Sequence, residues 1–188
     1  ADANKVRIRF MPKLTKDSIQ LREQGVDLDI GVLGVETSPE IRMKALFQDR
    51  FVGVISPSHP LIKQQINASN FAAAQHVLVS KQGGERGPVD EALAALNLNR
   101  DIAVFTGGFA ASLALVKGGE LVASVPAKHT QNLRLGLHSF ELPFDVPSMQ
   151  VSMFWHPRMD GDQAHKWLRD CVQTVCQSDE ITANSSPA

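Results

Sequence analysis

The fold is decided by the stretch from Val77 to Val125, which reads VLVSKQGGERGPVDEALAALNLNRDIAVFTGGFAASLALVKGGELVASV. Three apolar runs in this stretch have the length of buried strands, at 77–80, 102–105 and 121–125. Between them lie two patterns of helical period, at 88–96 and 109–117. A proline stands at the start of the first pattern and two glycines follow the second, as is typical of helix boundaries. The alternation of strand and helix predicts parallel strands and therefore an α/β domain.

Elements of the same kind flank this stretch on both sides. Alternating apolar and basic residues predict a strand at 5–10 with one buried face. Apolar runs predict two further strands at 28–33 and 51–55 and one near the end of the chain at 151–155. A short helix is expected at 16–24, and an apolar stripe from Ala164 to Val175 predicts a longer one.

Two proline-rich breaks, at 56–60 and 143–147, indicate that the chain crosses twice between two lobes. We expect lobe I to comprise residues 1–56 and 148–178 and lobe II residues 57–147, each with a mainly parallel sheet. Residues 179–188 are small and polar and are expected to form a disordered tail.

Composition excludes several classes of function. The 188 residues are 43% hydrophobic and 21% charged, with a formal net charge of -1, so they lack the basic excess of a nucleic-acid-binding domain. No run of apolar residues is long enough to span a membrane, and the first residues do not have the pattern of a signal peptide. Cys171 and Cys176 would point apart on a helix, which favours reduced thiols and a cytoplasmic protein.

Several local motifs occur in an order that resembles one known family. They are Gly25–Leu28, Phe51–Ile55 followed by Ser58-His59-Pro60-Leu61, Val122–Pro126 and the pattern from Ala164 to Val175. From about residue 5 to residue 177 the chain resembles the effector-binding domain of LysR-type transcriptional regulators. The resemblance implies a periplasmic-binding-protein-like fold of two lobes, of which the first begins late because the family's opening strand and helix have no counterpart here.

The resemblance also implies a function. It predicts a cytoplasmic sensor of a small molecule, without enzymatic activity or cofactor, that forms a homodimer or tetramer. DNA would be bound only through a helix-turn-helix domain that these residues do not contain.

Candidate ligand-binding residues stand where predicted strands end. In α/β sheets, ligands bind at the carboxyl ends of the strands, where helix-start N–H groups converge and glycines allow close approach. With the cleft location that the resemblance implies, we predict an effector site between the lobes for a small molecule that is anionic or strongly polar. The predicted site residues are Thr15, Ser80, Lys81, Arg86, Thr106, Gly107, Gly108 and Phe109.

Alternative interpretations remain at this stage. The same residues fit ordinary turn and capping chemistry with solvated charges. A periplasmic-type solute-binding protein would share the two-lobe plan, and so would a bilobal enzyme. No metal site and no catalytic residues are predicted, because the six histidines have no ligand spacing and no serine stands in a G-x-S-x-G motif.

Overall fold

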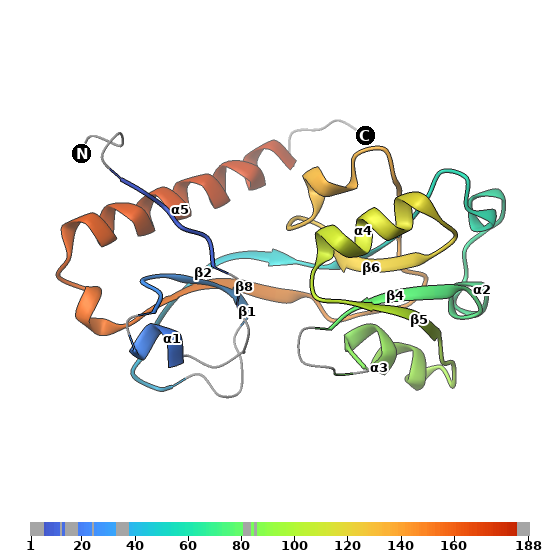
Figure 1. Ribbon diagram of the computed structural model, residues 1–188, viewed down its shortest axis with the longest axis horizontal. Coiled ribbons are helices and arrows are strands. Elements are labelled where there is room, and N and C mark those ends of the chain that lie inside the picture. Colours follow the sequence, from blue (N-terminus) through green and yellow to red (C-terminus); the bar gives the residue numbers. More distant parts are fainter. Residues whose placement is uncertain are drawn as a thin grey trace. The chain divides into compact units, whose positions relative to one another are not determined.

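The computed structural model describes residues 6–11, 13, 19–23, 25–32, 38–80, 84 and 86–183, and the side chains among them up to residue 177. The chain forms two compact units (Figure 1). The first unit is Ala1–Phe47 with Val151–Ala188, and the second unit is Gln48–Gln150.

The second unit is built on a five-stranded sheet in the order β5-β4-β6-β3-β7. β4 pairs in parallel with both β5 and β6, so the stretch that decides the fold supplies the parallel half of the sheet, as predicted. β3 pairs antiparallel with β6 and β7, so the sheet is mixed and not mainly parallel as predicted for this lobe. The strands are β3 (Phe51–Ile55), β4 (Gln75–Val79), β5 (Asp101–Thr106), β6 (Val122–Pro126) and β7 (His138–Glu141).

Helices cover both faces of this sheet (Figure 1). On one face, Leu113 and Val116 of α4 (Phe109–Gly118) pack on Val52, Val54 and Val125. The other face is covered by α2 (Ala68–Ala72), α3 (Pro88–Ala95) and the 3-10 turn η2 (Pro60–Lys63). Burial on both faces explains why β3 and β6, in the middle of the sheet, are nearly continuous apolar runs in the sequence.

The predicted lobe boundary at residue 56 is wrong. β3 was expected to close lobe I, but it lies between β6 and β7 in the sheet of the second unit. Val52 and Val54 are buried in the cluster under α4, which gives β3 its place there. The chain therefore enters this unit at Gln48 and leaves it after Gln150, and neither crossing point carries a proline.

The histidine of the Ser58-His59-Pro60-Leu61 motif has a structural role. His59 is buried, its Nδ1 accepts the Leu61 N–H at 3.1 Å, and its Nε2 lies 2.8 Å from the Glu120 carbonyl oxygen. With Nε2 as the donor, the ring joins η2 to Glu120, two residues before β6. The motif thus anchors the turn after β3 and does not belong to the predicted site.

Gly53 is required by close packing within the same sheet. A Cβ at this position would lie 2.3 Å from Cζ of Phe140, the residue opposite Gly53 on β7. The Phe140 ring packs in the cluster that fills this face of the sheet. Any larger residue at position 53 would therefore displace a partly buried aromatic ring.

The first unit has a three-stranded sheet in the order β1-β8-β2. β1 (Asp29–Val32) pairs antiparallel with β8 (Met149–Trp155), and β2 is Arg42–Asp49. The helices are α1 (Ile19–Arg22) and α5 (Gln163–Ala183), with a 3-10 turn η4 at Pro157–Met159. Leu21, Ile41 and Phe154 form a small buried cluster.

Three expectations for the first unit are corrected. The predicted strand at 5–10 is absent from the described residues 6–10, where Val6, Ile8 and Phe10 are exposed and have no surface to pack against. The sheet is not mainly parallel, because its β1–β8 pairing is antiparallel. The tail expected to be disordered from residue 179 continues α5 as far as Ala183.

Candidate functional site

Two of the predicted ligand-binding strand ends meet in the second unit. β4 and β5 are parallel, with Val79 opposite Thr106, so both end at the same edge of the sheet. The Ser80 N–H donates to the Thr106 carbonyl oxygen at 2.9 Å, which joins the two ends directly. The Thr106 hydroxyl donates to the Gly108 carbonyl oxygen at 3.3 Å. The backbone of Ser80 and the hydroxyl of Thr106 are therefore both held at this edge of the sheet.

The two glycines after Thr106 border open space. A Cβ at Gly107 or Gly108 would meet no atom within 4 Å. Gly108 is the N-cap of α4, has an extended backbone and accepts the Ser112 N–H at 3.2 Å. The first N–H groups of a helix have no acceptor within the helix. The start of α4 therefore offers backbone donors next to a space that no side chain fills.

The start of α3 is fixed by a buried ion pair. The Asp90 carboxylate accepts the Gly87 N–H at 2.8 Å and two hydrogen bonds from Arg100 at 2.7 and 2.8 Å. Burial raises the pKa of the Asp90 carboxyl, but the hydrogen bond and charge of Arg100 outweigh it and lower this pKa below its usual value. Gly87 is thereby held in place directly after the exposed Arg86.

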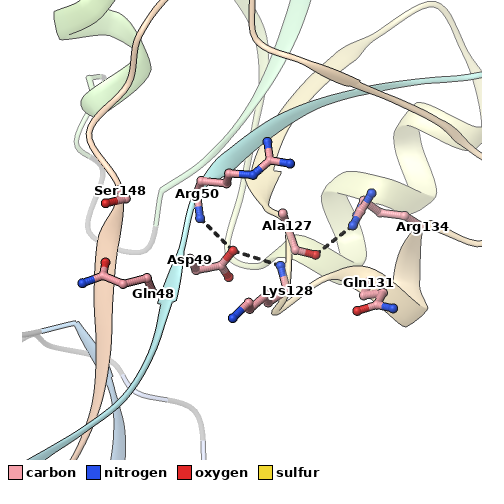
Figure 2. Close-up of a pocket in the computed structure, with 8 residues that line it drawn as sticks. All are labelled: Gln48, Asp49, Arg50, Ala127, Lys128, Gln131, Arg134 and Ser148. Atoms are coloured by element: carbon pink, nitrogen blue, oxygen red, sulfur yellow. Dashed lines mark hydrogen bonds between the residues drawn. The ribbon is translucent and has the colours of Figure 1, made fainter. Parts of the chain in front are cut away.

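A cavity of roughly 320 Å³ lies at the start of β3 (Figure 2). The carboxylate of Asp49 stands in it and accepts three backbone N–H groups, from Arg50 at 2.8 Å, Lys128 at 2.9 Å and His129 at 3.1 Å. The lining residues are Gln48, Asp49, Arg50, Ala127, Lys128, Gln131, Arg134 and Ser148.

Two of the cations that line the cavity are engaged within the protein. Arg50 forms a two-pronged ion pair with Glu141, in which Nη2 lies 2.7 Å from Oε1. Arg134 donates to the Ala127 carbonyl oxygen at 2.8 Å (Figure 2) and to the hydroxyls of Thr130 and Ser139. The Arg134 guanidinium thereby holds the segment after β6 in shape.

A ring contact links this cavity to the strand ends. The rings of Phe109 and His129 meet edge to face, with centroids 5.5 Å apart. Phe109 is the first residue of α4, and His129 follows Lys128. The open ends of β4 and β5 and the Asp49 cavity are therefore neighbouring parts of one unit.

The structure brings together most of the predicted site. Ser80, Thr106, Gly107, Gly108 and Phe109 gather at the ends of β4 and β5, and Arg86 lies exposed at the start of α3. Thr15 and Lys81 lie outside the described residues.

Sequence reasoning missed the cavity altogether. Asp49 and its partners at 128–129 are about 80 positions apart, so no local spacing marks them. Among the described residues, no three His, Cys, Asp or Glu side chains gather as a metal site would require, and Cys171 and Cys176 are not disulfide-bonded. No described helix combines the length and apolar character needed to cross a membrane.

Comparison with known proteins places the chain in a family. The family model for the LysR substrate binding domain matches residues 1–177. The HTH-type transcriptional regulator SyrM of Rhizobium etli is 29% identical over 160 residues, which cover 83% of this chain and 47% of SyrM. The chain spans about half the length of the curated relatives it matches.

Solved structures share the fold. The probable transcriptional regulator PA0477 from Pseudomonas aeruginosa matches with a TM-score of 0.78 at 24% identity, covering 91% of this chain and 58% of that one. The effector binding domain of QuiR in complex with shikimate gives a TM-score of 0.67 at 20% identity, covering 85% of this chain and 76% of that one.

The chain belongs to the LysR substrate binding domain family. The α/β, periplasmic-binding-protein-like fold and the family predicted from the sequence are both confirmed. The family and these relatives are transcriptional regulators and not enzymes, which gives no support to the enzymatic or solute-binding alternatives.

Proposed function

We propose that this domain binds a small polar or anionic effector at the carboxyl ends of β4 and β5. The observation that carries the proposal is the joined pair of strand ends, Ser80 to Thr106, beside open space at Gly107 and Gly108. Hydroxyl groups and the first N–H groups of α4 would then contact the effector together, an arrangement that favours negative charge. Arg86 directly precedes Gly87, which Asp90 holds in place, and adds a positive charge. Thr15 and Lys81 are also proposed to contact the effector, on the sequence pattern alone.

Binding at this site would act on transcription within a longer protein. We propose that a helix-turn-helix domain outside these residues contacts DNA, and that the protein works as a homodimer or tetramer in the cytoplasm. The relatives are named as HTH-type regulators, which supports the first point. An effector shifts a conformational equilibrium only by the difference in its affinity for the two states, so the site needs to bind one state better.

A substitution at Ser80 tests the site. A thermal-shift screen of small carboxylates, with shikimate included because QuiR was solved with it, first identifies a binding compound. Its affinity is then measured by calorimetry for the wild type, Ser80→Trp and the control Ser69→Trp, which places the same ring on an exposed serine of α2. We expect Ser80→Trp to abolish binding and Ser69→Trp to leave it unchanged.

The outcomes are distinct. Equal affinity in wild type and a folded Ser80→Trp variant would place the binding site elsewhere. If Ser80→Trp no longer unfolds cooperatively, Ser80 belongs to the core, and the proposal that it borders a ligand is wrong.

A further inference from the structure

The carboxylate of Asp49 occupies a place that suits an anionic ligand. Successive N–H groups that point to one spot form a concavity for anions. Here the N–H groups of Lys128 and His129, which follow β6, converge with that of Arg50 on the two carboxylate oxygens. Figure 2 shows the Arg50 and Lys128 bonds. Hydrogen bonds from N–H groups to a charged acceptor are stronger than those between neutral groups.

None of the salt bridges between described residues involves the carboxylate of Asp49. Asp49 is only 3% exposed, and its three hydrogen bonds all come from the backbone. The guanidinium groups of the cavity bind elsewhere, Arg50 to Glu141 and Arg134 to oxygens of its own segment. Backbone N–H groups are therefore the donors that hold the carboxylate in place.

We propose that Asp49 is a built-in anionic ligand that fills an anion site at the carboxyl end of β6. With its side chain removed, the cradle of N–H groups binds a free carboxylate in its place. Resting on the proposed function, the same residue sets the orientation of the effector. Its fixed negative charge repels an anionic group from the β6 end and directs that group to the ends of β4 and β5.

Asp49 is also a positioning residue for the open strand ends. It fixes the backbone of His129, and the His129 ring packs on Phe109, the first residue of α4. The carboxylate thus sets the shape of the segment that borders the start of α4.

Chemical rescue by formate tests the proposal. The variants Asp49→Ala and Asp49→Ser open the cradle, whereas the control Asp49→Asn fills it with a neutral group of the same shape. Thermal unfolding of each variant and of the wild type is followed in sodium formate and in sodium chloride at equal ionic strength. We expect formate to raise the Tm of the Ala and Ser variants by at least about 3 °C more than chloride does, with saturation.

Amide resonances locate the bound anion. In the Ser variant, formate should shift the N–H signals of Lys128 and His129, and in the wild type and Asp49→Asn it should shift neither. If Asp49→Ala is unfolded in chloride, formate should restore its circular dichroism.

Equal Tm values in formate and chloride for both opened variants, or no refolding of an unfolded one, would overturn the proposal. An equally large formate effect on the wild type would also overturn it. The formate rescue needs no effector, so it can succeed even if Ser80→Trp shows the proposed function to be wrong. Likewise, Ser80→Trp can abolish effector binding even if formate does not rescue the Asp49 variants. The two proposals can therefore fail separately.

Discussion

Two parts of one sheet edge differ in what satisfies the backbone N–H groups after the strands. β4, β5 and β6 are parallel, so their carboxyl ends lie at the same edge. After β4 and β5 the chain presents the hydroxyls of Ser80 and Thr106 and two glycines that border open space. After β6 the backbone donors are taken by the buried carboxylate of Asp49.

The difference shows what separates a structural strand end from one that can bind a ligand. The backbone chemistry is the same at both places, because N–H groups after a parallel strand attract negative charge. At β6 the protein satisfies them with its own side chain and gains stability. At β4 and β5 no such side chain is seen among the described residues, and the proposed function assigns these donors to a ligand.

The largest loss of stability is expected at the carboxyl end of β6, which the Asp49 carboxylate closes. Asp49→Ala leaves three partly buried N–H groups without their acceptor, at about 1–2 kcal/mol each. We expect the free energy of unfolding to fall by about 4 kcal/mol, measured by urea denaturation. A loss below about 1 kcal/mol would show that water replaces the carboxylate and that the end is not closed.

The pH dependence of stability tests the burial of His76 in the sheet that carries both groups of strand ends. The pKa of His76 on β4 is lowered from 6.5 to about 4, chiefly by burial. The hydrogen bond to the Phe71 carbonyl oxygen and the charge of Asp90 raise this pKa, whereas the charges of Arg100 and His59 lower it. The unfolded chain therefore takes up a proton near pH 6.5, whereas the folded chain does not until about pH 4.

The free energy of unfolding should thus fall by about 3 kcal/mol between pH 6.5 and 4 through this group alone. In His76→Gln, which keeps a donor for the Phe71 carbonyl oxygen, that part of the pH dependence should vanish. An identical slope in this variant would mean that His76 is not its source.

Smaller changes in stability are expected from alanine substitutions at Gly53 and Gly108, which have contrasting surroundings. Gly53→Ala forces a methyl group into the Phe140 ring and should cost about 2 kcal/mol in urea denaturation. A stability within about 0.5 kcal/mol of the wild type would show that the ring moves away freely.

Gly108→Ala should change stability least. The backbone there is extended and the added methyl group meets no protein atom, so we expect a loss of only about 0.5–1 kcal/mol, from the preference for glycine over alanine at an N-cap. The same variant should lose at least about tenfold in effector affinity by calorimetry, if the effector approaches the start of α4 closely. Unchanged affinity would remove Gly108 from the site.

The predictability of the fold follows from burial. β3, β5 and α4 were predicted nearly to the residue because apolar runs and helix boundaries are local signals. β2 was not predicted, since most of its residues are exposed and its sequence alternates little. The crossing at Gln48 was placed too late because the proline break after β3 is only a turn, which His59 anchors.

The residues of the candidate site likewise divide into those that the sequence predicts and those that only the structure reveals. Ser80 and Thr106 could be predicted because each directly follows a recognisable strand, and parallel strands end together. Asp49 could not, since an aspartate at the end of a polar strand has no distinguishing pattern until folding brings residues 128 and 129 to it. Local patterns therefore reveal the open strand ends, and only the structure reveals the closed one.

Amide chemical-shift mapping with the best-binding compound of the carboxylate screen is the most direct test of whether the ligand binds at the ends of β4 and β5 and not at the end of β6. The account predicts the largest changes at Ser80, Thr106, Gly107 and Gly108, with small changes at Lys128 and His129, whose N–H groups Asp49 already holds. Large changes at Lys128 and His129 with none at Ser80 and Thr106 would contradict it.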